Sequence, residues 1–519
     1  MLRIRVRDAA MNQRVPCRLH IKLADGSCWM PEEPREARYS ETDAPDLLLP
    51  SHLDRYLNIC QGADIRSVHL NHGEADLDVP PGNATIHIAR GHEYVPIIEH
   101  CEIGPKPLQR DYRLERLANL PAQGWYGGDL HVHVSRFEPE DDWVWLRLMA
   151  AEDLHAADSL VYKHNGGVIQ APQYAMGEPS ERCLDGRVLA GGEEFRDGNL
   201  FGHMIMAGIQ EVIEPISVGQ MLAGTDNYPL FATACDRAHE AGGIVGWAHG
   251  GGVFNRLNES LVVEAALGKV DFVEVIQFNS FFGYRFWRQL LNCGIRLSGT
   301  GGSDFPFGAD MLAPWYPNFG LDRTVVHVNG DFSHSKWLDG IRRGKCFATN
   351  GPLLSLTVNG QPIGSEIPIS TSESRVTVEA RAVCNYPLEH LDILCNGAVA
   401  HRVEGQAGQH ELAFEGQIVL DGSTWIAACA RGEVAPETYG GVRSWNLWAH
   451  TSPVYCLTDG RPVRIASDRA CMADCVRVCM VKYLGQGFCK GGRFSSDAQV
   501  QELIRNCRKA IEFYEREGA

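Results

Sequence analysis

Six residues between positions 131 and 304 combine the two side-chain types that most often bind transition metals, imidazole and carboxylate. They are His131, His133, Glu194, His203, His249 and Asp304. His131 and His133 lie two residues apart in a strand-like segment, so both imidazoles can face one side and reach a single ion. A lone His-x-His pair is unremarkable in a chain with 20 histidines, where a surface strand is the plain alternative. The pair gains weight from the ligand-type residues that follow it.

This donor set predicts both the kind of ion and its chemistry. Imidazole with carboxylate suits Zn²⁺, Mn²⁺ or Fe²⁺. A structural zinc takes four ligands, whereas six ligands fit two ions that share a carboxylate and keep positions open for water. Two ions about 3.5–4 Å apart polarise a substrate oxygen and lower the pKa of bound water towards about 7. The residues therefore predict a hydrolase that uses a metal-bound hydroxide. The alternative is that several of the six are core residues without a metal.

The elements that position these residues belong to a segment, residues 119–350, in which strand-like and helix-like stretches alternate. Residues 128–133 are predicted to form a strand, and Pro139 with the acidic residues after it opens a helix that extends to about His155. Repeated alternation predicts an α/β fold with a parallel sheet covered by helices. Nearly all candidate ligands follow the carboxyl ends of strands, where β/α barrels build their active sites.

Segments rich in strand-like alternation flank this unit. Residues 1–118 predict a small β-sandwich, and residues 351–460 predict a second one. Residues 461–519 are predicted to be helical and to pack on the body. The last helix begins after a Ser496 cap, and its apolar face is expected to comprise Leu503, Ile504, Ala510, Ile511 and Phe513.

Composition narrows the classes of function. The formal net charge of −17 disfavours non-specific nucleic-acid binding, and 44% hydrophobic with 22% charged residues is typical of soluble globular proteins. The sequence has no signal-peptide core and no apolar run long enough for a membrane helix. Its 17 cysteines are dispersed without a Cys-x-x-Cys pair, which favours reduced thiols. We expect a cytoplasmic protein that acts on a small molecule, without nucleic-acid or membrane partners; homo-oligomer formation stays open.

Several motifs, in order along the chain, resemble the PHP (polymerase and histidinol phosphatase) superfamily, in its carbaryl-hydrolase-like CehA/McbA-type branch. They are Gly-Asp-Leu-His-Val-His at 128–133, Glu194 in Glu-Glu-Phe-Arg, Gly202-His203, Ala248-His249, Gly302-Ser303-Asp304 and Phe-Ala-Thr-Asn-Gly-Pro at 347–352. The first β module is also similar to prealbumin-like domains of the carboxypeptidase-regulatory type. The resemblance implies a distorted (β/α)7 barrel that binds two or three metals. It divides the ligands between a first metal, on His131, His133, Glu194 and Asp304, and a second, on the bridging Glu194, His203 and His249.

The sequence departs from this family at two positions. Lys163-His164 stands where an Asp-His pair is typical, and Pro306 replaces the histidine of a Ser-Asp-x-His motif. In the family these positions belong mainly to a third metal. We therefore expect a degraded third site and a cofactor of one or two divalent ions, Zn, Mn or Fe.

Five further residues are candidates for roles near the metals. Lys163, Arg196 and His164 are predicted to take part in catalysis. Lys163 can neutralise developing charge or contact substrate, or form only a salt bridge, and Arg196 can bind an anionic group or form a structural ion pair. Asp129 and Glu274 are expected behind the ligands, with Glu274 orienting a histidine.

The leading prediction is a metal-dependent hydrolase that cleaves a small-molecule ester, carbamate or amide. A phosphoesterase of the wider PHP type is the first alternative, and a catalytically degraded binding protein is the second. A basic cluster of Lys163, Arg196 and Arg323 at the mouth of the barrel would favour phosphoesters. A mouth lined by aromatic residues, such as those of 281–284 and 315–316, would favour the carbonyl substrates. No Gly-x-Ser-x-Gly, Walker A or Rossmann glycine motif occurs.

Overall fold

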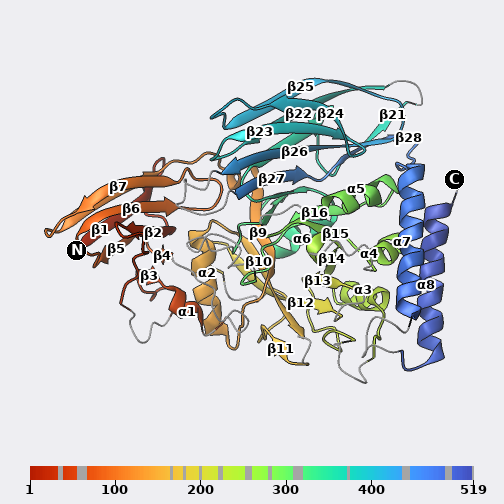
Figure 1. Cartoon of the computed structure of the whole chain (residues 1–519), viewed down its shortest axis with the longest axis horizontal. Helices are drawn as coiled ribbons and strands as arrows, with labels where there is room; N and C mark the ends of the chain where they lie inside the picture. Colours follow the sequence, from red (N-terminus) through yellow and green to blue (C-terminus); the bar gives the residue numbers. More distant parts are fainter. Residues whose placement is uncertain are drawn as a thin grey trace.

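The structure is a computed structural model of the whole chain (Figure 1). It describes residues 1–32, 39–54, 56, 67–163, 167–178, 183–197, 201–219, 226–251, 260–278, 283–307, 319–370, 374–434, 445–485 and 494–516. These residues form a mixed α/β protein with extensive sheets and a few helices.

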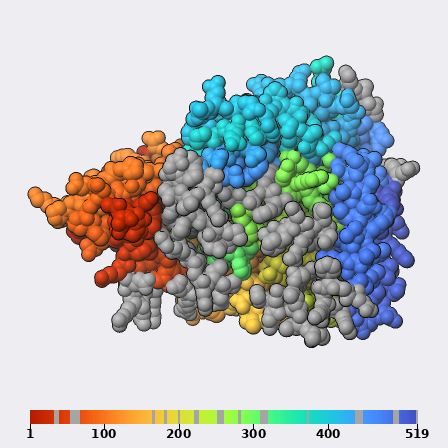
Figure 2. Space-filling model, viewed as in Figure 1, coloured from red at the N-terminus to blue at the C-terminus, as the bar shows by residue number. Residues whose placement is uncertain are grey.

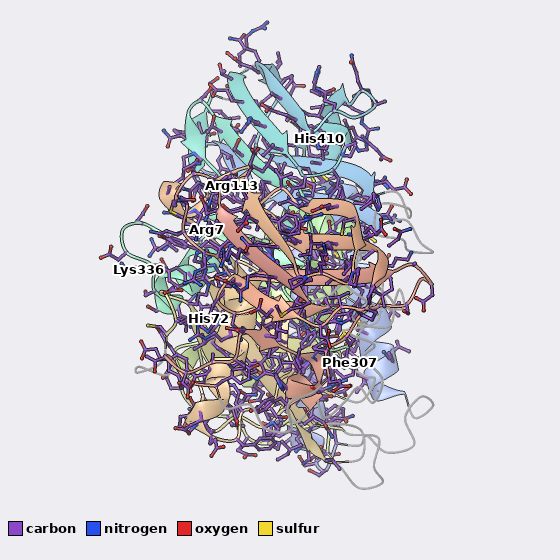
Figure 3. All side chains as sticks on the ribbon, turned by 90° about the vertical axis from the view of Figure 1, so that its left-hand side faces the viewer. Arg7, His72, Arg113, Phe307, Lys336 and His410 are labelled. Atoms are coloured by element: carbon purple, nitrogen blue, oxygen red, sulfur yellow. The ribbon has the colours of Figure 1, made fainter. Side chains whose placement is uncertain are left out.

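The N-terminal part consists of two small sheets, drawn red to orange in Figure 1, with strand orders β5-β1-β8 and β3-β4-β2-β6-β7. Its elements are β1 (Leu2–Asp8), β2 (Cys17–Leu23), β3 (Leu47–Leu48), α1 (Pro50–Asp54), β4 (Val68–Leu70), β5 (Glu74–Leu77), β6 (Gly82–Ala89), β7 (Ile97–Ile103) and β8 (Leu108–Leu114). Residues of β1 are alternately buried and half-buried, so Leu2, Ile4 and Val6 share one face in the apolar core. Arg7 and Arg113, both labelled in Figure 3, are register partners on β1 and β8.

The central part carries all the candidate ligands. Its elements are β9 (Trp125–Val132), α2 (Asp142–Ala151), β10 (Ala156–Lys163), β11 (Ile169–Gln170), β12 (Val188–Arg196), β13 (His203–Ala207), α3 (Phe231–Glu240), β14 (Ile244–Trp247), α4 (Leu261–Ala266), β15 (Phe272–Ile276), α5 (Tyr284–Asn292), β16 (Ser298–Gly301), β17 (Arg323–His327), α6 (His334–Arg342) and β18 (Cys346–Thr349). Short 3-10 turns lie at Pro121–Gln123, Pro139–Asp141 and Ala248–Gly251.

The central sheet is mixed rather than parallel. Its strands follow the order β16-β15-β14-β13-β12-β10-β9-β17-β18. Two runs are parallel as predicted, β9-β10-β12 and β14-β15-β16, but β13 is antiparallel to both neighbours and β17 is antiparallel to β9. The prediction of a parallel sheet is wrong for these two strands. Arg196 and His203 are register partners, and a connection that short can return the chain only antiparallel.

The sheet curls so that its first strand approaches β9 and β17, without a backbone ladder that closes it among the described residues. Gly301 N donates to Thr324 Oγ1 at 3.0 Å, and the same hydroxyl donates back to Gly301 O at 2.9 Å. Nearby, His133 N donates to Phe305 O at 2.6 Å. Side-chain and loop hydrogen bonds thus hold the two margins together, and a closed (β/α)7 barrel stays a prediction.

The C-terminal β part, at the top of Figure 1, is continuous with the central sheet because β27 pairs with β18. Its strands are β19 (Leu353–Val358), β20 (Gln361–Pro362), β21 (Glu366–Ile369), β22 (Ser374–Val383), β23 (Leu388–Cys395), β24 (Ala398–Glu404), β25 (Glu411–Leu420), β26 (Thr424–Val434), β27 (Trp445–Thr451) and β28 (Val454–Thr458). A separate sheet, β20-β19-β22-β25, packs on the extension through buried residues such as Leu356, Val378 and Leu391. Two layers around one core are what a β-sandwich requires.

Two long helices, α7 (Ala466–Leu484) and α8 (Asp497–Glu515), form the blue flank at the right of Figures 1 and 2. Ser496 caps α8, and its buried face comprises Leu503, Cys507, Ala510 and Tyr514. This corrects the expected face, since Ile504, Ile511 and Phe513 lie at its margin. Tyr514 donates a 2.8 Å hydrogen bond to Val262 O, so the helices pack on the central part. In the described part of the chain, no helix combines the length and apolarity needed to cross a membrane.

Candidate metal centre

All six candidate ligands lie at one edge of the central sheet. The His-x-His pair comes from the end of β9, and Glu194 comes from the end of β12. His249 and Asp304 follow the ends of β14 and β16. His203 begins β13, and because this strand runs antiparallel, its first residue lies at the same edge. Strand direction therefore gathers residues that are far apart in the sequence.

The first group of ligand atoms surrounds the ends of His131 and His133, whose Nε2 atoms are 3.2 Å apart. Asp304 Oδ1 lies 3.3 Å from His131 Nε2 and 3.0 Å from His133 Nε2. Glu194 Oε2 lies 3.5 Å from His133 Nε2. All four side chains are buried.

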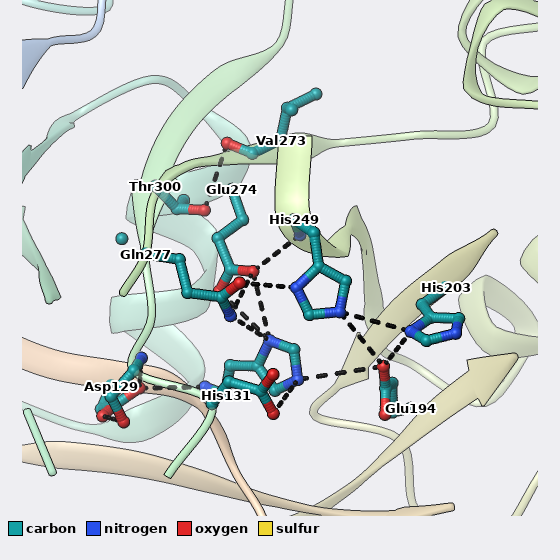
Figure 4. Close-up of polar contacts among 12 residues, drawn as sticks. Asp129, His131, Glu194, His203, His249, Val273, Glu274, Gln277 and Thr300 are labelled. Atoms are coloured by element: carbon teal, nitrogen blue, oxygen red, sulfur yellow. Dashed lines mark hydrogen bonds and ion pairs between the residues drawn. The ribbon is translucent and has the colours of Figure 1, made fainter. Parts of the chain in front are cut away.

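The second group uses the other oxygen of Glu194. Oε1 lies 2.8 Å from His203 Nδ1 and 3.8 Å from His249 Nε2, and these two nitrogens are 3.3 Å apart (Figure 4). The ligand atoms of His131, His133 and Glu194, and those of Glu194, His203 and His249, lie close enough together in each set to surround one ion. Glu194 thus lies between the two sets of imidazole nitrogens, with Oε2 towards His133 and Oε1 towards His203 and His249; His131 Nε2 lies 4.0 Å from Oε1.

Three of the imidazoles are oriented by a hydrogen bond from the ring nitrogen that points away from the cluster. His131 Nδ1 lies 3.2 Å from both oxygens of Glu274, and His133 Nδ1 lies 2.9 Å from Leu160 O. His249 Nδ1 lies 2.5 Å from Gln277 Oε1. Because each Nδ1–H donates outwards, each Nε2 presents a lone pair to the cluster.

These lone pairs fit a cation. The cluster brings imidazole nitrogens and carboxylate oxygens, all electron-pair donors, to within 2.8–4.0 Å of one another. Such groups repel one another at these distances unless protons or a metal ion lie between them. The mixture of nitrogen and oxygen donors matches Zn²⁺, Mn²⁺ or Fe²⁺.

The pKa values of the cluster show that its carboxylates stabilise positive charge on their neighbours. Burial lowers the pKa of His131, but the carboxylates of Asp304 and Glu274 outweigh it and raise the pKa to about 10. Burial raises the pKa of Glu194, but the Arg196 guanidinium and His203 outweigh it and hold the pKa well below its usual range. The second proton of His131 can reside only on Nε2, the position a metal would take. Metal binding would therefore displace this proton.

The Gly302-Ser303-Asp304 motif is explained by what surrounds it. A Cβ atom on Gly302 would lie 2.2 Å from Glu274 Oε1, so only glycine leaves room for the Glu274–His131 contact. Ser303 Oγ donates to Asp129 Oδ2 at 2.5 Å, and Ser303 N donates to Asp129 Oδ1 at 3.0 Å. Asp129 also accepts from His131 N at 3.1 Å. It therefore ties the β9 backbone to the loop that carries Asp304, and it does not touch an imidazole ring.

Two candidate ligands have left-handed backbone conformations, His249 with φ 58° and Asp304 with φ 54°. Such conformations cost energy for a residue with a Cβ and occur preferentially at functional sites. The turn at His249 is held in part by its own backbone, because His249 N donates to Glu274 Oε2 at 2.9 Å.

Of the basic residues predicted to line the mouth, Arg196 contacts a candidate ligand and Arg323 does not. Arg196 lies 3.3 Å from Glu194 Oε2, with its guanidinium over the ring of Tyr162. Lys163 ends β10 and is half-buried, and His164 falls outside the described residues. Arg323 points away from the ligand edge, donating to Gly320 O and Glu152 O. Arg323 is therefore not part of a basic mouth.

Aromatic rings stand close to the imidazoles. His133 lies against Tyr162 and Phe307, with ring centroids 4.7 and 5.6 Å apart, and Phe278 stacks near His249 at 6.4 Å. Phe307 is labelled in Figure 3. Residues 281–282 and 315–316, predicted to line the mouth, lie outside the described residues.

The sequence alone did not single out Gln277, Tyr162 and Phe307. Gln277 directly follows β15, and Tyr162 is the penultimate residue of β10. Both stand at the strand ends from which the ligands were chosen, so position was the available signal. Their side chains are not typical metal ligands, so ligand chemistry gave no signal for them.

Comparisons with known proteins found a match among solved structures. No family model matches the chain, and no curated protein matches it. A crystal structure from Bacteroides vulgatus, of a two-domain protein containing a predicted PHP-like metal-dependent phosphoesterase, aligns with 13% identity and a TM-score of 0.31. The alignment covers 59% of this chain and 90% of that one.

Proposed function

We propose that this chain is a metal-dependent hydrolase with a centre for two divalent ions. The observation that carries the proposal is the position of Glu194 among all four imidazoles: its Oε2 lies 3.5 Å from His133 Nε2, and its Oε1 lies 2.8–4.0 Å from nitrogens of the other three. A carboxylate shared in this way is the usual bridge of a two-metal hydrolytic site. A structural zinc site would instead close four ligands around one ion.

Within this proposal the ligands divide as the family resemblance implies. The first ion would be held by His131, His133, Asp304 and Glu194, and the second by Glu194, His203 and His249. A divalent ion bound there supplies Lewis acidity and lowers the pKa of water.

The chain's own residues would orient the ligands and shape the pocket. Glu274, Gln277 and Leu160 O hold the ring nitrogens outside the cluster. Arg196 places a fixed positive charge beside Glu194. Tyr162 and Phe307 cover one side of His133, which limits the access of water there.

We propose an uncharged small-molecule ester, carbamate or amide as the substrate class. Arg323 is directed away from the ligand edge, and Arg196 already pairs with Glu194, so the basic cluster expected for phosphoesters is reduced. The aromatic neighbours of His133 and His249 favour an uncharged substrate. Phosphoester hydrolysis remains the second candidate because Lys163 and Arg196 stay near the ligand edge. A catalytically inactive binding protein is the third.

The convergence of the ordered motifs on one sheet edge supports membership of the PHP superfamily, and the CehA/McbA-type branch is part of the proposal. So are the distorted barrel, its two flanking β-sandwiches and the cytoplasmic location. Lys163, Arg196 and His164 remain candidates for contact with the substrate.

The test combines metal analysis with a substrate screen on the full chain. Purified protein should contain up to two equivalents of Zn, Mn or Fe and hydrolyse aryl esters or carbamates faster than p-nitrophenyl phosphate. Glu194→Gln should lose at least one ion and most of the turnover, since an amide cannot bridge two cations. Glu193→Gln is the matched control, because Glu193 is buried on the opposite face of β12 and accepts from Ile213 N. Equal metal content and turnover in Glu194→Gln and the native chain would overturn the bridging role.

A further inference from the structure

Gln277 lies directly after β15, is 1% exposed, and bonds to two groups that support different halves of the candidate centre. Its Oε1 accepts from His249 Nδ1 at 2.5 Å, and its Nε2 donates to Glu274 Oε2 at 3.0 Å (Figure 4). Both polar atoms of the amide are engaged by these neighbours, so its role is exerted through them.

The orientation of this amide is fixed by charge. If its oxygen and nitrogen were exchanged, a carbonyl oxygen would face the Glu274 carboxylate, and two acceptors would meet at 3.0 Å. Glu274 therefore forces the amide oxygen towards His249. That oxygen can only accept, so the ring of His249 has to carry its proton on Nδ1 and expose the lone pair of Nε2.

Glu274 performs the same task for the other half of the centre. It accepts from His131 Nδ1 at 3.2 Å and from His249 N at 2.9 Å. The four side chains form one buried chain of hydrogen bonds: His131, Glu274, Gln277 and His249. Its two ends are imidazoles whose Nε2 atoms approach the same oxygen of Glu194, at 4.0 and 3.8 Å.

An amide suits this position better than a second acid. A carboxylate at Gln277 would meet Glu274 at about the same 3.0 Å and repel it unless a proton were shared. A neutral amide donates to one partner and accepts from the other, so it extends the orienting effect of Glu274 to His249 without adding charge.

We propose that Gln277 is a positioning residue that orients His249 for the second ion and links the two halves of the centre through Glu274. This inference rests on the proposed two-ion centre. It predicts that ion binding at the half of the centre containing His249 depends on Gln277 more than ion binding at the half containing His133. The reason is that His133 Nδ1 donates to Leu160 O and not to the hydrogen-bonded chain of Gln277.

The experiment titrates the full-length chain, stripped with a chelator, with Zn²⁺ against a chromophoric competitor, and it measures two affinities. Gln277→Met is close in size and cannot accept from His249. It should weaken one affinity by about 10- to 100-fold, the usual effect of losing a partner of a metal-bound histidine, and weaken the other affinity less. Gln277→Glu keeps the acceptor for His249 Nδ1 and, by sharing a proton with Glu274, should retain two ions.

Thr300→Val is the matched control, because Thr300 is buried on β16 opposite Glu274 and donates to Val273 O, outside the hydrogen-bonded chain. It should bind both ions as the native chain does. Thermal unfolding with chelator present should give native-like transitions for all variants. If Gln277→Met does not fold, Gln277→Asn, whose amide is too short to reach both partners, replaces it.

The outcomes separate this inference from the proposed function. A native chain that binds no divalent ion overturns both. A native chain with two ions and a Gln277→Met variant that binds both with native affinity, or loses both equally, overturns the role of Gln277 alone. An equal loss in Thr300→Val would show a general disturbance of the sheet and would also overturn it.

Discussion

Two of the buried clusters of histidines and acids in the described part of the chain balance their charges in different ways. One lies between the N-terminal sheets and the residues after α2. There Arg18 Nη1 lies 2.9 Å from Glu152 Oε2, and His69 Nε2 lies 2.9 Å from the other oxygen. Arg90 pairs in the same way with Asp153 at 2.7 Å. Each acid of this interface therefore faces an arginine, a permanent cation.

The candidate metal centre has the same residue types but lacks that balance. Glu194, Glu274 and Asp304 converge on imidazoles, and Arg196 is the one arginine paired with them among the described residues. Buried histidine beside carboxylate therefore does not by itself indicate a metal. A shortage of fixed cations among converging electron-pair donors does.

The largest difference between the clusters should appear on neutralising one acid in each. Asp304→Asn keeps the shape of the side chain but removes charge beside His131 and His133. We expect loss of bound metal and a fall in turnover of about 10³-fold, as when a group that stabilises transition-state charge is removed. Asp153→Asn, the counterpart in the interface, should lower stability and leave metal per folded chain unchanged. Metal analysis and steady-state kinetics on both variants check this, and the comparison fails if both lose metal alike.

Removing an acid from the interface cluster should lower the stability of the fold and leave the metal content unchanged. Glu152→Ala would leave Arg18 and His69 buried without the carboxylate that both now face. Breaking a buried ion pair in this way typically costs about 3–5 kcal/mol in the free energy of unfolding. Urea unfolding in the presence of chelator measures the loss. The metal stoichiometry of the folded fraction should stay native, and a drop in it would show that the two clusters are coupled.

Lowering the pH should destabilise the interface between the N-terminal sheets and the residues after α2 through Glu152. Burial raises the pKa of Glu152, but Arg18 and His69 outweigh it and hold the pKa below its ordinary value of 4.5. Because the folded pKa is the lower one, this stabilisation is present above pH 4.5 and is lost as the pH falls through the folded value. Each unit of difference is worth about 1.4 kcal/mol. Unfolding at pH 7 and pH 4 should show a smaller loss for Glu152→Gln than for the native chain, and equal losses would contradict the assignment.

The sequence predicted which side chains gather but not how they are supported. His131 and His133 could be paired from spacing alone, and Glu194, His249 and Asp304 from their positions after strand-like segments. The direction of β13 could not be predicted from alternation, because it depends on how short the loop before it is. Gln277 could not be predicted either, since its role arises from the backbone turn at His249 and from the charge of Glu274, both of which are tertiary features.

The smallest expected effect tests the substrate class. Arg196 makes one contact of 3.3 Å with Glu194 and lies over Tyr162, so it would act on an uncharged substrate only through Glu194. For an uncharged ester or carbamate, Arg196→Met should therefore lower kcat/KM by less than about tenfold. A phosphoester would lose a charge-assisted hydrogen bond worth about 1.5–3 kcal/mol, roughly 10- to 100-fold, mostly in KM. Kinetics with matched aryl ester and aryl phosphate substrates distinguish the two. A large rise in KM for the phosphate alone, with the phosphate also the faster substrate in the native chain, would reverse the preference for carbonyl substrates and give Arg196 the role of an anion-binding residue.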